Sequence, residues 1–255
     1  MRKYFKLLLK TGVSSWLMLS YGKTAYAAPQ LPIPSIHFIQ PAQNPAQTAL
    51  TLQIILLLTI LSLAPSILIM MTSFTRIIVV LSFVRNGLGM QQVPPNQVLI
   101  GLALFMTVFV MAPVWSNINT QALQPYMKQE ITTEEALQRA QQPLRDFMFR
   151  QTREKDLALF LHYANLQKEV KTLEDVPTYV LIPAFIISEL KTAFQMGFVI
   201  FIPFLVIDII VSSTLMSMGM LMLPPIMISL PFKILLFVMV DGWNLVINSL
   251  IAGFR

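Results

Sequence analysis

Two residues of opposite charge, Asp208 and Lys233, lie inside apolar segments near the C-terminus of this 255-residue chain. Each such charge costs at least about 2.5 kcal/mol if it is left unpaired in a bilayer. The sequence MSMGMLMLPP at 216–225 lies midway between them, so an antiparallel helical hairpin about this turn would bring the two groups level. We therefore expect a buried ion pair, within one subunit or between neighbours, that fixes helix register. The alternative is that one group is protonated or extends to the membrane surface.

The turn between these charges is rich in methionine, and its candidate gate residues are Met218, Met220, Leu221 and Met222. Thioether side chains are unbranched and adaptable, so they suit a seal that closes on itself and yields to many polypeptides. The pattern favours a conduit or its gate over catalysis, although methionine also serves as ordinary apolar filler.

Composition places the chain among membrane proteins. Hydrophobic residues make up 55% of it and charged residues only 12%, whereas a soluble domain carries about 25% charged residues. Proline recurs within the long apolar segments. We therefore predict an all-α membrane protein with about four long, proline-kinked apolar helices and a charged helical insert.

The first 27 residues are similar to a secretory signal peptide. A basic start at 1–6 precedes a short apolar stretch at 7–19, and the sequence AYA at 25–27 offers a cleavage site after Ala27. The alternative, an uncleaved first membrane helix, requires a longer apolar stretch. Cleavage would leave 13 basic against 12 acidic residues, a net charge of +1. A charge this small gives no support to nucleic-acid binding.

Metal and cofactor chemistry finds little support in the sequence. The chain has no cysteine, and neither His37 nor His162 has a second ligand at metal-binding spacing. The phosphate-binding motif Gly-x-x-x-x-Gly-Lys-Ser/Thr is also missing from the sequence. We expect no cofactor, no metal and no nucleotide hydrolysis by this chain.

Changes in composition divide the chain into five segments. We expect a cleaved signal peptide at 1–27, an extended proline-rich periplasmic arm at 28–46, an N-terminal helical hairpin at 47–115, a periplasmic helical insert at 116–178 and a C-terminal helical hairpin with the methionine-rich turn at 179–255.

The expected topology follows from the apolar segments at 48–71, 97–115, 180–211 and 226–251. The loop after the first segment carries Arg76 and Arg85 and no acid, so the positive-inside tendency places it in the cytoplasm. With four crossings, the insert and the C-terminus lie outside and the methionine-rich turn faces the cytoplasm.

The insert at 116–178 contains eight basic and nine acidic residues. Thr132, followed three residues later by Glu135, resembles a capping box and predicts the start of a helix there. Because the charges are mixed in sign, a solvated helix face is the plainest interpretation. A segment of about 60 residues offers too little core to fold alone.

Glu189 and Lys191 lie two residues apart, so they point to different faces of a helix. At least one of them must contact a neighbouring subunit or a wet interior. We assign both to inter-subunit polar contacts.

An aromatic stripe follows on the same predicted helix. Phe194, Phe198 and Phe201 recur at steps of four and three residues, and Gly197 beside them permits a close approach of another helix. We expect these four residues to serve helix packing rather than to line a pore.

Two segments are specific enough to indicate a family. They are PAFIISELKTAFQMGF at 183–198 and PFKILLFVMVDGW at 231–243. Both resemble the signature segments of the bacterial flagellar FliP family, which injectisome relatives share. With the signal, the apolar spans and the charged insert in matching order, the resemblance covers residues 45–252.

The resemblance implies a structural subunit of the flagellar type III protein export gate. Such subunits form a ring of five that joins FliQ-like and FliR-like subunits, with an FlhB-like subunit as a further partner, and unfolded flagellar proteins pass through its centre. The implied location is the bacterial inner membrane at the flagellar basal body, with the assembled complex toward the periplasm and its helices packed as a tilted shell. In the family three consecutive methionines constrict the pore. The matching positions here are Met220, Leu221 and Met222, and leucine is the stiffer side chain.

Two other functions compete with an export gate. A proton-coupled secondary transporter would use Asp208 and Glu189 as proton-relay carboxylates, but it would also predict inverted repeats, and none is convincing in this sequence. An intramembrane enzyme would need a nucleophile with its base, or paired carboxylates at helical spacing, and the spans contain neither. We therefore expect a pore subunit that is not an enzyme.

Overall fold

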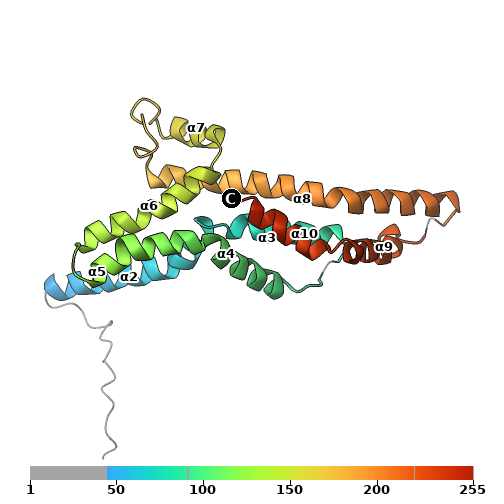
Figure 1. The fold of residues 1–255 in the computed structure, drawn as a ribbon, viewed down its shortest axis with the longest axis horizontal. Coiled ribbons are helices and arrows are strands. Elements are labelled where there is room, and N and C mark those ends of the chain that lie inside the picture. The colour runs from blue at the N-terminus through green and yellow to red at the C-terminus, as the bar shows by residue number, and fades with distance from the viewer. Residues whose placement is uncertain (1–44, 91, 221, 255) are drawn as a thin grey trace, which may run out of the picture. The chain divides into compact units, whose positions relative to one another are not determined.

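The computed structural model describes residues 45–90, 92–220 and 222–254. The expected cleavage after Ala27 and the expected arm, apart from its last two residues, lie outside the described part of the chain. The chain comprises two units, Met1–Leu57 and Leu58–Arg255, and helix α2 (Pro45–Met70) begins in the first and ends in the second. Every regular element among the described residues is a helix (Figure 1), which confirms the all-α prediction.

The helices after α2 follow one another with short connections, apart from the longer loop before α8. In chain order they are α3 (Phe74–Gly87), α4 (Asn96–Ile118), the π-helix η1 (Asn119–Leu123), α5 (Gln124–Met127), α6 (Thr133–Gln151), α7 (Glu154–Tyr163), α8 (Thr178–Ser217), α9 (Pro225–Met239) and α10 (Gly242–Ala252).

Helix α3 is the most deeply buried helix of the second unit, although the sequence predicts a cytoplasmic loop there. Its side chains Ile77, Val80, Leu81 and Val84 are fully buried, and the helix packs mainly against α8 and α4. These residues recur at steps of three and four, so they form one apolar face of the helix that is turned toward the core. Our interpretation of residues 72–96 as a loop was therefore wrong for its first half.

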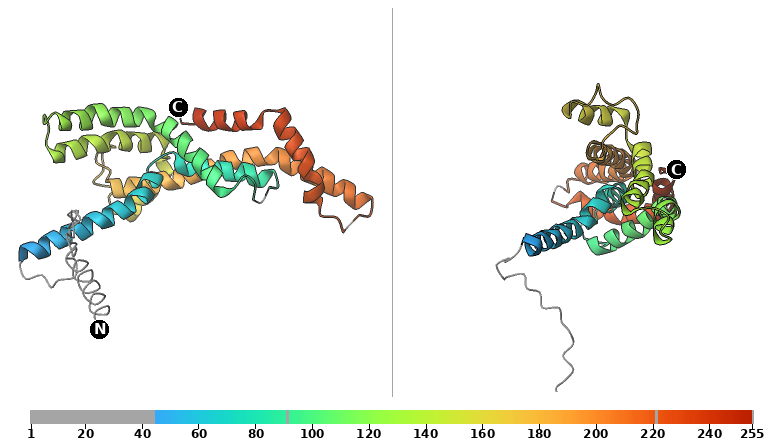
Figure 2. Two further views of the ribbon diagram at one scale, coloured as in Figure 1. Left: turned by 90° about the horizontal axis from the view of Figure 1, so that it is seen from below. Right: turned by 90° about the vertical axis from the view of Figure 1, so that its left-hand side faces the viewer.

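Helix α8 is one uninterrupted helix of 40 residues (Figure 1), although Pro183 and Pro203 lie inside it. Each proline removes one backbone hydrogen bond, but packing against α3 and α9 holds the helix together. The expected last span at 226–251 is instead two helices. Helices α9 and α10 meet at an angle of 64° (Figure 2), next to Asp241, whose φ of 49° is left-handed.

Among the described residues, the structure offers fewer candidate membrane spans than the four that the sequence predicts. In the described part, Asn96–Met127 and Thr178–Ser217 are long and apolar enough to cross a membrane, and the bent pair α9–α10 could form a third span. Helix α2 contributes a shorter apolar stretch, Thr51–Ile67. These helices fit a membrane location, but they do not confirm four crossings.

The charged insert does not fold apart from the rest of the second unit. The helix that begins at Asn96 continues through η1 to Met127, across the boundary expected at 116. Helix α6 begins where the sequence predicts, because the Thr132 hydroxyl accepts a hydrogen bond of 3.3 Å from the Glu135 backbone N–H. Its Phe147 then packs with Phe185 of α8 in a second apolar cluster, so the insert shares a core with the long helix.

Candidate functional site at the α8–α9 hairpin

Helices α8 and α9 form the hairpin that the sequence predicts, and the methionine-rich turn is its tip. Gly219 adopts a left-handed φ of 75°, which glycine tolerates without a steric penalty. Met222 is 98% exposed, and Met218 and Met220 are also exposed, whereas Leu221 lies outside the described residues. A tip that projects several thioethers away from the chain can make apolar contacts with another molecule.

Below the tip, the structure brings Asp208 and Lys233 together. Asp208 Oδ2 lies 2.6 Å from Lys233 Nζ, and Asp208 Oδ1 accepts a hydrogen bond of 2.6 Å from the Ser229 hydroxyl. Lys233 is only 2% exposed and the Asp208 side chain is partly exposed. The ammonium is therefore neutralised where water has little access, and Ser229 is a third member that the sequence analysis did not identify.

The loop between α3 and α4 also approaches this ion pair. Gly89 has a left-handed φ of 78°, and a Cβ atom at that position would lie 3.8 Å from Lys233 Nζ. Ile226 and Leu230 of α9 lie at similar distances from the same position, 3.6 and 3.7 Å. The loop after α3 thus packs against the hairpin next to the ion pair.

Glu189 forms a second buried ion pair, with Arg76 of α3. The Arg76 guanidinium donates to both carboxylate oxygens, one of them through Nε at 3.0 Å. It also donates to the Gln151 side chain and to the Gly253 carbonyl, each at 2.8 Å, and lies over the Phe254 ring. Glu189 is fully buried and bound within its own chain, a partner that the sequence analysis did not identify, and its expected inter-subunit contact stays a prediction.

Lys191 also finds its partner within the chain, in Asp156 of α7. The Ser188 hydroxyl donates to the other Asp156 oxygen at 2.8 Å. Burial alone would raise the pKa of Asp156, but the hydrogen bonds from Lys191 and Ser188 and the charges of Lys191 and Arg153 together bring that pKa below its usual value. The Lys191 side chain is half exposed, so an additional inter-subunit contact by it stays a prediction.

The aromatic stripe of α8 is divided between packing and exposure. Phe194 meets Phe83 of α3 edge to face, with ring centroids 5.4 Å apart, while Phe198 is 60% exposed. A Cβ atom on Gly197 would come within 2.5 Å of the Phe83 ring, so the glycine permits the close approach of α3.

Phe201 packs on α3 at another glycine. Its Cδ2 atom lies 3.2 Å from the position that a Cβ atom of Gly87 would take. The stripe is therefore used in part for the helix packing that we expected.

The sequence analysis missed Arg76, Asp156 and Ser229. The sequence alone indicates that Arg76 needs an anionic partner, because it is a cation within a largely apolar segment. Asp156 gave no such signal among the mixed charges of the insert. Among the residues that the structure describes, no group of three or more histidine, aspartate and glutamate side chains could hold a metal ion.

Comparison with known proteins decides the family. The sequence profile of the FliP family matches residues 57–250, which include the three ion pairs of α8 and the methionine-rich turn. The chain belongs to the FliP family. It is similar to "Flagellar biosynthetic protein FliP" of Bacillus subtilis (strain 168), with 59% identity over 213 residues that cover 84% of this chain and 96% of the relative.

Other FliP relatives extend the similarity along the chain. The Aquifex aeolicus (strain VF5) protein of the same name is 51% identical over 206 residues, covering 80% of this chain and 86% of the relative. The one from Borreliella burgdorferi is 46% identical and covers both chains completely. The family resemblance inferred from 183–198 and 231–243 is therefore confirmed.

Proposed function

We propose that this chain is a structural pore subunit of the flagellar type III protein export gate. The observation that carries the proposal is membership of the FliP family over residues 57–250, with relatives named flagellar biosynthetic proteins. The long apolar helices fit a membrane-embedded component of such a system.

The α8–α9 hairpin supports a role in closing the pore. Its tip exposes Met218, Met220 and Met222, and adaptable thioethers can close a passage and yield to varied polypeptides. The Asp208–Lys233 pair holds the two arms of the hairpin in register. When several subunits surround one axis, their hairpin tips would form a ring of methionines.

We infer that five subunits form this ring and that it joins FliQ-like, FliR-like and FlhB-like subunits. Unfolded flagellar export substrates are the cargo. The location proposed is the bacterial inner membrane at the flagellar basal body, with the assembled complex toward the periplasm. The exposed apolar faces of α4 and α8 support burial against lipid or other subunits.

A proton-coupled transporter is not favoured. It requires Asp208 and Glu189 to exchange protons during a cycle, but each carboxylate is bound to a cation, Lys233 and Arg76 respectively. Two carboxylates that are each held in an ion pair suit a fixed packing arrangement better than a proton relay.

Co-expression with FliQ-like and FliR-like partners, followed by native mass spectrometry of the purified material, tests the proposal. We expect one discrete complex that contains several copies of this chain without residues 1–27. Expression of the chain with an unrelated membrane protein in place of both partners is the control, and it should give no such complex. A monomer or simple dimer that binds neither partner would contradict the proposal.

A further inference from the structure

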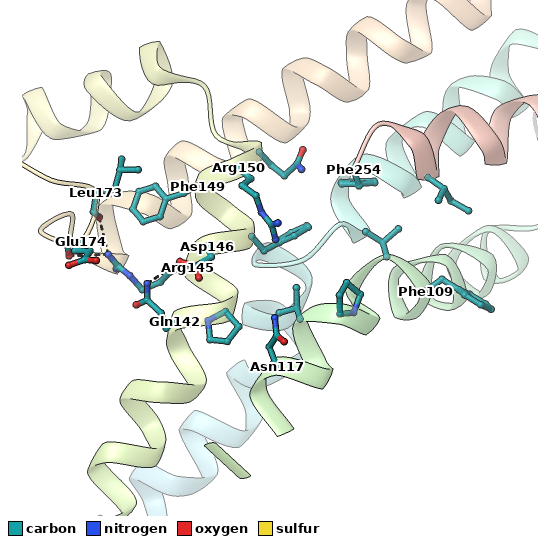
Figure 3. Close-up of a pocket in the computed structure, with 17 residues that line it drawn as sticks. Phe109, Asn117, Gln142, Arg145, Asp146, Phe149, Arg150, Leu173, Glu174 and Phe254 are labelled. Atoms are coloured by element: carbon teal, nitrogen blue, oxygen red, sulfur yellow. Dashed lines mark hydrogen bonds between the residues drawn. The ribbon is translucent and has the colours of Figure 1, made fainter. Parts of the chain in front are cut away.

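A cavity of about 1140 Å³ lies between α4, α6 and the C-terminal residues (Figure 3). One wall is apolar and comes from the second half of α4, with Phe109, Pro113 and Val114. The opposite wall comes from α6 and carries the charged side chains of Asp146 and Arg150 beside Phe147 and Phe149. A cavity with one apolar and one charged wall fits an amphipathic ligand.

The apolar wall continues onto the exposed face of a candidate membrane span. Phe109 is 76% exposed, and Phe105, one turn earlier on α4, is 72% exposed. The helix that carries both, Asn96–Met127, is long and apolar enough to cross a bilayer. An acyl chain that lies along this face could therefore enter the cavity without leaving an apolar environment.

The charged wall carries an acidic and a basic side chain that do not form an ion pair with each other. Asp146 and Arg150 are four residues apart on α6, the spacing and order that favour an ion pair. No ion pair between these two described residues forms, and the Asp146 carboxylate instead accepts a hydrogen bond of 3.0 Å from Gln142. Arg150, labelled in Figure 3 among the side chains that line the cavity, is exposed.

The same helix provides a comparison for this open pair. Glu135 and Arg139 have the same spacing and order, lie away from the cavity, and form an ion pair of 2.6 Å. The neighbouring Arg145 is not free to bind a ligand, because it donates to the Val176 carbonyl and to the Thr178 hydroxyl, each at 2.7 Å. Of the α6 arginines that line the cavity, Arg150 is therefore the one available to an anion.

We propose that this cavity binds a zwitterionic amine phospholipid, with its phosphate on Arg150, its ammonium group on Asp146 and an acyl chain on the apolar wall of α4. Arginine matches phosphate oxygens with two parallel donors, and a carboxylate four residues away matches the ammonium group. The inference rests on the membrane location and the cavity, not on the export function.

Titration of the delipidated full chain in detergent with dioleoyl phosphatidylethanolamine, followed by native mass spectrometry, tests the proposal. Arg150→Ala should weaken binding at least about tenfold, because a charge-assisted hydrogen bond to the phosphate is lost. Arg150→Lys should retain part of the affinity, since it keeps the charge but not the paired donors. Arg139→Ala, on the same helix outside the cavity, should bind as the wild type does.

A second series separates the two charges of the headgroup. Asp146→Asn should weaken binding of phosphatidylethanolamine about two- to fivefold, while binding of phosphatidylglycerol, which has no amine, should not change. Thermal unfolding without lipid checks that each variant is folded. Equal affinities of Arg150→Ala and Arg139→Ala would overturn the proposal, and so would a folded wild type that binds no added phosphatidylethanolamine.

Discussion

At Asp208 the carboxylate is held by two donors, Lys233 and Ser229, each 2.6 Å away. Removing an ion from water costs several kcal/mol, so the pair contributes less to stability than the loss of one partner would cost. The pair therefore acts mainly by fixing how α9 lies against α8. Removing one partner should destabilise the protein more than removing both partners together.

We expect Asp208→Ala to lower the free energy of unfolding by about 3 kcal/mol, the lower end of the range for a buried pair because Asp208 is partly exposed. Gate assembly or export should fall as well. Asp208→Ala combined with Lys233→Ala should be milder than either single variant, because no uncompensated charge remains. Thermal unfolding of the purified chain and motility of a complemented strain measure both effects. Two single variants with wild-type unfolding and export would show that the pair is not structural.

Asp156 provides a pH-dependent contact between α7 and α8. Its pKa in the folded chain is lowered from about 3.8, so its stabilising effect is complete above that value and is lost as the pH falls below it. Lys191 is half exposed, so we expect the loss to be about 1 kcal/mol. Thermal unfolding between pH 6 and pH 3 should therefore show a smaller acid-induced decrease for Asp156→Asn than for the wild type. Glu154→Gln, at an exposed position of the same helix, should keep the wild-type profile.

At the scale of elements, hydropathy predicts α8 and the hairpin but not α3. The hairpin follows from local features, a turn between two apolar segments with charges at equal distances from it. Helix α3 contains Arg76, which lowers the hydropathy of this segment. In the folded chain the charge of Arg76 is neutralised by Glu189, which lies 113 residues further along the sequence. A partner so distant in sequence cannot be assigned from spacing. The break between α9 and α10 was missed for another reason. It depends on the left-handed conformation of a single residue, Asp241, and the segments on both sides of that residue are apolar, so together they resemble one span.

The close packing of α3 on α8 depends on Gly197. Gly197→Ala would place a methyl group within 2.5 Å of the Phe83 ring and 2.9 Å of its Cβ atom, so one helix must move. We expect a loss of about 1–3 kcal/mol in the free energy of unfolding. Gly101→Ala is the matched control in α4, where no atom lies within 4 Å, and it should stabilise the helix by about 0.5–1 kcal/mol. Equal unfolding temperatures for the two variants would contradict this account of Gly197.

At the scale of the whole molecule, much of the surface is adapted to contacts that the single chain does not make. Phe105 and Phe109 of α4 and Phe198 of α8 are exposed, as is the methionine tip of the hairpin. Large exposed apolar surfaces mark sites of protein or membrane contact. The family could be predicted from two sequence segments, but the division of this surface among lipid, partners and other copies depends on the assembly.

If the hairpin tips meet on the axis of a ring, a cysteine at Met222 should cross-link between neighbouring subunits. The chain contains no cysteine, so Met222→Cys gives a single reactive thiol. We expect disulfide-linked dimers after mild oxidation of the assembled gate, because a disulfide requires Cα atoms about 4.4–6.8 Å apart. Tyr163→Cys, at an exposed position of α7, should not cross-link. Non-reducing gel electrophoresis provides the readout, and monomeric Met222→Cys in an assembled gate would argue against a closed methionine ring.

The bond between Arg76 and Glu189 also imposes an order on biosynthesis. Translation adds about 5–20 residues per second, so Arg76 leaves the ribosome roughly 6–23 s before its partner, which lies 113 residues later. During this interval α3 carries an uncompensated guanidinium group that lipid would reject. The packing of α3 against α8 can therefore be completed only after α8 has been synthesised. The ion pair and the apolar core around α3 thus form late, once most of the chain has been made.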